Sequence, residues 1–158
     1  MSSQVFISYS HDNDKHKNWV LQLATRLRHN GVDVILDQWN LKLGQDLASF
    51  MEKGLSESQR VLCVCSEIYV QKANKKTSGV GYEKQIMTAE LMENLNTDWI
   101  IPIIKNNDSS NKVPLFLKGR LYISFENDIL HESKYEELLR DLLSEPVLPI
   151  PPLGENPF

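Results

Sequence analysis

Short apolar runs alternate with amphipathic stretches along most of the chain, and this alternation is the strongest constraint on its fold. Strand-like apolar runs occur at 5–10, 32–37, 60–66, 99–104 and 121–125. Helical periodicity occurs at 19–27, 47–55, 82–94 and 135–143. Strands that alternate with helices indicate right-handed βαβ units. We therefore expect an α/β, flavodoxin-like single domain with a five-stranded, mostly parallel sheet and helices on both faces.

Capping and breaking residues predict where several elements begin and end. The polar residues 11–15 offer N-caps for the first helix, and Gly31 suits its end. Asp46 is a plausible N-cap for the second helix. A polar stretch at 71–81 follows the third strand, and the loop after that strand is expected to cover 66–81. Pro102 lacks an N–H, so we expect it at a sheet edge, a bulge or a strand start.

Composition excludes several classes of protein. The 158 residues, 41% of them hydrophobic, suffice for one domain with a core. A net charge of −4 gives no general electrostatic reason to bind nucleic acid. No apolar run is long enough for a membrane span. Residues 1–4 lead directly into a strand-like run, so we expect no secretory signal. Cys63 and Cys65 fit two buried thiols on one strand face, so we expect a cytoplasmic protein.

The last residues differ in composition from the rest. Five of the seven prolines follow Glu145, which favours an extended polyproline segment over packed structure. We therefore expect a domain at 1–145 and a Pro-rich tail or linker at 146–158.

Ligands of such folds bind beyond the carboxyl ends of the strands, where the strand order reverses. The loops to consider are 8–15, 37–46, 66–81 and 105–119. The third strand ends in Cys65-Ser66, without the aspartate of a phosphoacceptor site. No two histidines have the spacing of metal ligands on one helix face, so we expect no metal site. His16 and His29 are expected on the solvated side of the first helix.

Glu83 is the one isolated carboxylate that the topology singles out. It lies in the first turn of a predicted helix, beside Tyr82 and just after the turn Gly79-Val80-Gly81. The glycines alone are a weak nucleotide-binding signal. A glutamate at this position ordinarily complements the helix dipole. A catalytic role is the alternative, because the helix start should border the same crevice as the loop that begins at Ser8.

Four sequence boxes, taken in order, resemble the TIR (Toll/interleukin-1 receptor) domain family, and most closely its bacterial and SEFIR-type members. Residues 5–12 resemble the first box, a strand followed by acidic residues. Residues 31–44 resemble the second strand and the family's BB loop. Residues 58–66 resemble the third strand, and 81–84 the stretch that carries the catalytic glutamate. The similarity extends from Val5 to Leu143.

The resemblance implies an enzyme that cleaves NAD+ between nicotinamide and ribose, giving nicotinamide and ADP-ribose or a cyclic ADP-ribose isomer. NAD+ would be the substrate, and no further cofactor is implied. Glu83 would be the essential carboxylate, stabilising the oxocarbenium-like charge on the ribose. Nicotinamide is already cationic in NAD+, so its departure needs no general acid. Several family members carry a tryptophan four residues before this glutamate, where this chain has Gly79.

The resemblance also suggests substrate-binding residues, each with a structural alternative. They are Phe6, Ser8 and Tyr9 in the nucleotide crevice, Asp37, Trp39 and Lys42 at the BB loop, and Tyr82 beside nicotinamide. Phe6 is equally well explained as strand core. Trp39 would stack on a ring of the substrate or pack the loop down. Tyr82 would cover the nicotinamide pocket or pack inward.

Family members often become active by self-assembly, so the implied partners are further copies of the chain or other TIR domains, bound through residues 37–46. The implied biological role is anti-phage defence in bacteria. The main alternative is a non-enzymatic TIR or SEFIR scaffold that only binds other such domains. Another N-ribosyl transfer, such as base exchange, would use the same site.

Overall fold

The computed structural model describes residues 4–75 and 99–158. Strands and helices alternate in it as the periodicity predicts. The strands are β1 (Gln4–Ser8), β2 (Asp33–Ile35), β3 (Arg60–Cys65), β4 (Ile100–Ile104) and β5 (Ile123–Ser124). The helices are α1 (Asp14–His29), α2 (Asp37–Asn40), α3 (Leu47–Glu57), α4 (Glu67–Asn74) and α6 (His131–Leu143). Two short 3-10 helices cover Leu115–Leu117 (η2) and Asp128–Leu130 (η3).

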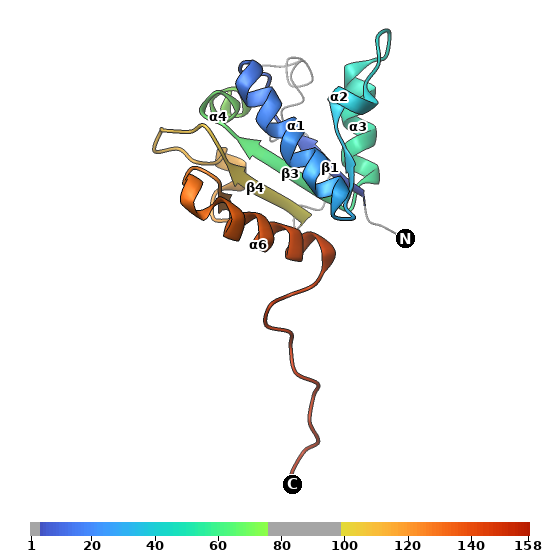
Figure 1. The fold of residues 1–158 in the computed structure, drawn as a ribbon, viewed down its shortest axis with the longest axis vertical. Coiled ribbons are helices and arrows are strands. Elements are labelled where there is room, and N and C mark those ends of the chain that lie inside the picture. The colour runs from blue at the N-terminus through green and yellow to red at the C-terminus, as the bar shows by residue number, and fades with distance from the viewer. Residues whose placement is uncertain (1–3, 76–98) are drawn as a thin grey trace.

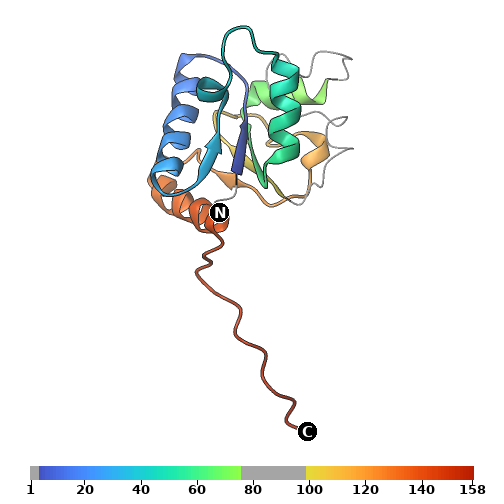
Figure 2. The same ribbon diagram turned by 90° about the vertical axis from the view of Figure 1, so that its right-hand side faces the viewer.

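The five strands form one sheet in the order β2-β1-β3-β4-β5, and every pairing is parallel. Helices α1 and α6 lie on one face, and α3 and α4 on the other (Figures 1 and 2). The connections from β1 and from β2 thus cross opposite faces, which places the reversal of strand order between β1 and β3. The expected flavodoxin-like α/β fold is confirmed.

Each face of the sheet has its own hydrophobic core. On the α1 and α6 side, alternate strand residues such as Ile7 and Val64 pack against Val20, Leu27 and Leu138. On the α3 and α4 side, Phe6, Cys63 and Cys65 pack with Met51 and Tyr69. Cys63 and Cys65 are buried, unbridged and on the same face, as their alternation predicts.

Residues that the sequence marks as helix boundaries lie at helix ends in the structure. The Asn13 side chain caps α1 by accepting a hydrogen bond of 2.8 Å from the His16 amide. Asp46 caps α3 through the Ala48 amide, at 3.1 Å. Gly31 follows the end of α1 with a φ of +93°, a conformation that glycine adopts without a steric penalty.

Two helices lie where the sequence suggested loops. Helix α4 begins within the stretch 66–81, because Ser66 caps it and Tyr69, Val70 and Ala73 bury one face. The single-turn helix α2 forms at the start of 37–46. Both are short, and their few apolar residues do not give a clear helical period.

Strand bounds also differ from the expectation. β1 ends at Ser8, two residues early. β5 has only two residues, and Leu121 and Tyr122, which were expected to belong to it, are exposed. Pro102 lies inside β4, which is an interior strand. β5 pairs only with Ile103 and Ile104, so β4 has no neighbour on that side at Pro102. The missing N–H is therefore tolerated, as it is at a sheet edge.

After α6 the chain extends away from the domain (Figure 1). Residues 145–158 are exposed and contain no helix or strand. Within the described ranges, none of the helices has both the length and the apolar character that a bilayer span requires.

Candidate functional site

The carboxyl ends of β1 and β3 bring two short polar segments together. Ser10 follows β1 and Ser66 follows β3, and their hydroxyl oxygens lie 3.2 Å apart. The Ser10 hydroxyl also donates a hydrogen bond to Asp12. Ser66 accepts a hydrogen bond of 3.1 Å from the Tyr69 amide and so fixes the start of α4. This junction lies where the strand order reverses, which is the position at which ligands of such folds bind.

Asp37 joins the loop after β1 to the start of the segment 37–46. Its Oδ1 accepts a hydrogen bond of 2.7 Å from the Tyr9 hydroxyl. Its Oδ2 lies 2.8 Å from Nε2 of His11. Gln38 donates to the Tyr9 hydroxyl over 2.8 Å. We call Tyr9, His11, Asp37 and Gln38 the loop-joint cluster.

The loop-joint cluster is buried at one end and open at the other. Tyr9 is fully buried and Asp37 nearly so, whereas 39% of the His11 side chain is exposed. Burial raises the pKa of Tyr9, and the neighbouring Asp37 carboxylate raises it further. Tyr9 therefore stays protonated as a donor. One oxygen of the Asp37 carboxylate accepts a hydrogen bond from the fixed Tyr9 hydroxyl. The other oxygen faces the accessible imidazole of His11.

Ser8 belongs to a second buried group on the opposite face of β1. Its hydroxyl lies 2.8 Å from the Tyr69 hydroxyl, which also accepts a hydrogen bond of 3.0 Å from the Cys63 thiol. Burial is the main cause that raises the pKa of Tyr69. The thiol of Cys65 lies 3.9 Å from that of Cys63, and this contact and burial raise the pKa of Cys65. Tyr69 and Cys65 are therefore neutral at pH 7.

His16 is buried, with 1% of its surface exposed, so the expectation that it lies on the solvated side of α1 is wrong. His29 is exposed, as expected. The side-chain amide of Asn106 donates 2.8 Å to Nδ1 of His16, and Nε2 has no hydrogen-bond partner in the described part of the chain. Burial lowers the pKa of His16, which favours the neutral ring. His16 is buried because α1 begins at Asp14, so that His16 lies one turn before Val20 on the same buried face, with its ring centroid 6.5 Å from that of Tyr9.

Phe6 is fully buried on the α3 face of the sheet. Its ring centroid lies 5.6 Å from that of Phe50. It also packs against Gly54 so closely that a Cβ on that glycine would collide with the ring. Phe6 is thus strand core in this structure, and Phe50 stands between it and solvent.

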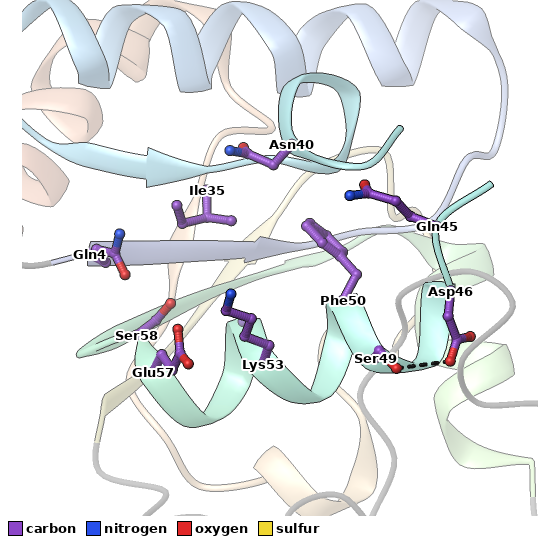
Figure 3. A pocket seen from close by; sticks show the side chains of 11 residues that line it. Gln4, Ile35, Asn40, Gln45, Asp46, Ser49, Phe50, Lys53, Glu57 and Ser58 are labelled. Atoms are coloured by element: carbon purple, nitrogen blue, oxygen red, sulfur yellow. Dashed lines mark hydrogen bonds between the residues drawn. The ribbon is translucent and has the colours of Figure 1, made fainter. Parts of the chain in front are cut away.

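A hollow of about 530 Å³ opens between α3 and the edge of the sheet formed by β1 and β2. Figure 3 shows Phe50 and Lys53 rising from α3 toward Ile35 and Gln4 on the strands. Asn40, Gln45 and Asp46 line its other end. The volume lies in the range of small-molecule sites, about 300–1,000 Å³.

Trp39 and Lys42 follow the loop-joint cluster along the chain and are more exposed than Tyr9 and Asp37. Trp39 is 37% exposed and lines a shallow hollow with Thr25, Arg28 and other residues on the α1 side. Lys42 is exposed, and its amide donates 2.6 Å to Oε1 of Gln45. Leu43, at the tip of this loop, is fully exposed.

Glu83, Tyr82 and Gly79 lie outside the described residues. Among residues 4–75 and 99–158, no three histidine, cysteine or acidic side chains are placed to hold a metal ion.

The sequence did not single out His11 or Gln38. His11 lies in the loop after β1, and its contact with Asp37, 26 residues away, has no local sequence signal.

The fold and the four boxes define the class of this protein. A family model described as TIR domain matches residues 5–143, and the chain belongs to this family. A prokaryotic SEFIR domain of known structure is 38% identical, with a TM-score of 0.78, and the match covers 88% of this chain and 97% of that domain. The resemblance to TIR domains, and to their SEFIR-type members, is confirmed.

Two more distant structures share the fold alone. The TIR domain of a Toll-related receptor from Hydra magnipapillata is 18% identical, with a TM-score of 0.63, over 90% of this chain and 99% of that one. A metazoan TIR-STING receptor from C. gigas is 17% identical, with a TM-score of 0.59, over 92% of this chain and 40% of that one. The search of curated proteins found no match.

Proposed function

We propose that this chain is an NAD+ nucleosidase that releases nicotinamide and forms ADP-ribose or a cyclic ADP-ribose isomer. Membership of the TIR family supports this, and so does Glu83 in the box at 81–84. The observation that carries the proposal is the loop-joint cluster. Asp37 holds the start of the 37–46 loop against the carboxyl end of β1, where ligands of such folds bind.

The chemistry requires one well-placed carboxylate. When the bond between C1′ and the nicotinamide nitrogen breaks, its electron pair neutralises the charge on the leaving ring. Positive charge develops on the ribose, and the role assigned to Glu83 is to stabilise it. A water oxygen then bonds to C1′ and loses a proton to solvent, or an adenine nitrogen attacks instead and closes a ring. The resemblance places Ser8, Tyr9 and Asp37 at the substrate. Because their side chains are engaged in hydrogen bonds with other residues, the role proposed for them is to hold the surrounding segments in place.

The test is NAD+ consumption and nicotinamide release, measured by chromatography on concentrated protein with and without a crowding agent. We expect turnover by the wild type and by Glu126→Gln, an exposed control, and none by folded Glu83→Gln. The product peak separates hydrolysis from cyclisation, and added pyridine bases reveal base exchange. Equal turnover by Glu83→Gln and the wild type would contradict the proposal.

A scaffold without catalysis is the second candidate. It is favoured by the similarity to a SEFIR domain and by the exposed apolar side chain of Leu43 at the tip of the 37–46 loop. Such a side chain is a typical contact for another protein. A scaffold would lose partner binding on Trp39→Ala or Gly44→Pro and would tolerate Glu83→Gln. Absence of turnover in every crowding condition, with self-association intact, would favour this candidate.

A further inference from the structure

The imidazole of His11 is the accessible member of the loop-joint cluster. Its Nε2 lies 2.8 Å from Oδ2 of Asp37, and 39% of the side chain is exposed. A carboxylate only accepts hydrogen bonds, so Nε2 carries the ring proton and donates the bond. In the neutral ring Nδ1 is then an unprotonated acceptor, and it forms no hydrogen bond within residues 4–75 and 99–158. An accessible imidazole in this state can take a proton from a reacting group.

The ring of His11 is held in one orientation. Asp37 is nearly buried, and its Oδ1 accepts a hydrogen bond of 2.7 Å from the Tyr9 hydroxyl. The Gln38 amide donates to the same hydroxyl over 2.8 Å, so the proton of that hydroxyl is directed toward Asp37. The rings of His11 and Tyr9 also pack together, with centroids 5.0 Å apart. A histidine whose tautomer and orientation are set by a buried carboxylate is the usual general base of hydrolytic sites.

His11 lies at the end of the sheet where ligands of this fold bind. β1 ends at Ser8, and His11 follows in the segment that leads to α1. In the same segment Ser10 meets Ser66, which follows β3, with their hydroxyl oxygens 3.2 Å apart. The strand order reverses between β1 and β3, so the segment that carries His11 borders the expected ligand position.

Hydrolysis of NAD+ contains a step for which the carboxylate of Glu83 is poorly suited. The water that bonds to C1′ must lose a proton. If Glu83 took that proton, the negative charge that stabilises the ribose cation would be lost at the same moment. A separate base avoids this conflict. Base exchange has no such requirement, because the attacking nitrogen of a pyridine carries no hydrogen.

We propose that His11 is the general base for hydrolysis of NAD+, an inference that rests on the proposed nucleosidase function. As the lone pair of a water oxygen forms the bond to C1′, Nδ1 of His11 takes one proton of that water. The Asp37 carboxylate stabilises the imidazolium that results, and the exposed ring then releases the proton to solvent. Asp37 is a positioning residue, because it acts through the ring and not on the reacting atoms.

The test follows two products in one mixture of NAD+ and 3-acetylpyridine. Chromatography measures ADP-ribose, which hydrolysis forms, and the acetylpyridine dinucleotide, which base exchange forms. We expect His11→Gln to lower the rate of ADP-ribose formation about tenfold or more and to leave the rate of exchange unchanged or higher. His29→Gln, at an exposed histidine of α1, should give the wild-type ratio of products. Because each sample supplies its own ratio, partial unfolding of a variant does not alter it.

Two further variants separate proton transfer from a structural role. His11→Ala should recover ADP-ribose formation when imidazole is added, because free imidazole can take the proton in place of the side chain. In Asp37→Asn the amide oxygen should remain at the Tyr9 hydroxyl, which places the amide nitrogen against Nε2 of His11. This nitrogen donates, so the ring proton moves to Nδ1. The ratio of hydrolysis to exchange should therefore fall although the imidazole is retained.

Equal losses of hydrolysis and exchange in His11→Gln would overturn the inference, because they would show that His11 only maintains the site. Unchanged hydrolysis in this variant would overturn it as well. A wild type that cyclises NAD+ without forming ADP-ribose would overturn the role of His11 and leave the proposed function standing. Absence of NAD+ consumption by the wild type would overturn the proposed function, and the role of His11 with it.

Discussion

The hydroxyl of Tyr9 donates a hydrogen bond of 2.7 Å to Oδ1 of Asp37, across 28 residues of sequence. This contact joins the carboxyl end of β1 to the first residue of α2. Because Asp37 also contacts His11, one carboxylate ties both loops together where the strand order reverses. Buried polar contacts therefore help to fix the relative position of these two loops.

Tyr9→Phe should lower the free energy of unfolding by about 1.5–3 kcal/mol, because a buried hydrogen bond to a charged acceptor is lost. The Gln38 amide would also lose its acceptor. Urea denaturation followed by circular dichroism measures this. Tyr122→Phe, at a half-exposed tyrosine, is the control and should have no effect. Equal values for wild type and Tyr9→Phe would show that the contact adds nothing to stability.

The same tyrosine should make stability sensitive to alkaline pH. The folded state raises the pKa of Tyr9 above its ordinary value of 10.0. The unfolded chain therefore loses the proton first, and the free energy of unfolding falls as pH rises above 10. Between pH 9 and 11 the wild type should lose more stability than Tyr9→Phe. Parallel losses in the two proteins would refute this.

His16 should make the free energy of unfolding sensitive to acidic pH. Burial lowers its pKa in the folded state, with Lys105 and His11 acting in the same direction and Asp12 against them. The unfolded chain thus binds the proton first as pH falls below 6.5, and the folded state loses stability. Unfolding at pH 7.5 and 5.0 should show a smaller loss for His16→Gln than for wild type. His29→Gln, on the exposed side of α1, should behave as wild type, and a loss in His16→Gln equal to that in wild type would disprove the assignment.

Gly54→Ala should be destabilising although alanine is the better helix former. The added methyl would collide with the ring of Phe6, and overpacking of this kind costs about 1–3 kcal/mol. The gain in helix propensity recovers at most about 1 kcal/mol. We expect a net loss of about 1–2 kcal/mol in urea denaturation. Gly154→Ala, with no atom near the new methyl, is the control, and a stabilised Gly54→Ala would contradict the close packing.

Leu43→Ser should weaken self-association without changing the free energy of unfolding, because Leu43 is fully exposed. Burial of one leucine contributes about 1.5–3 kcal/mol, so the dissociation constant should rise about tenfold or more. Sedimentation velocity at several concentrations measures this. Leu115→Ser, at an exposed leucine elsewhere, should associate as wild type does. If both variants associate equally, the 37–46 loop is not the contact.

The local signals in the sequence predicted most of the fold. Asn13 and Asp46 could be recognised as caps because a capping side chain bonds to a backbone group two or three residues away. The parallel sheet followed from alternating periodicities. Helix α4 was missed because its eight residues bury only three side chains, too few to establish a period.

The candidate sites were less predictable. Tyr9 and Asp37 were singled out by family resemblance, but no sequence signal showed that they contact each other. The hollow between α3 and the sheet had no sequence signal, because its walls come from β1, β2 and α3, which are separate along the chain.

The sequence by itself determined the order and type of most elements, the family of the chain and the candidate carboxylate Glu83. Periodicity, capping and motif spacing act within a few residues, so they can be read along the chain. Only the tertiary structure decided that Tyr9 meets Asp37, that His16 is buried and that Ser58 lines a hollow. These relationships depend on strand order, register and helix tilt, which bring together side chains that are distant in sequence.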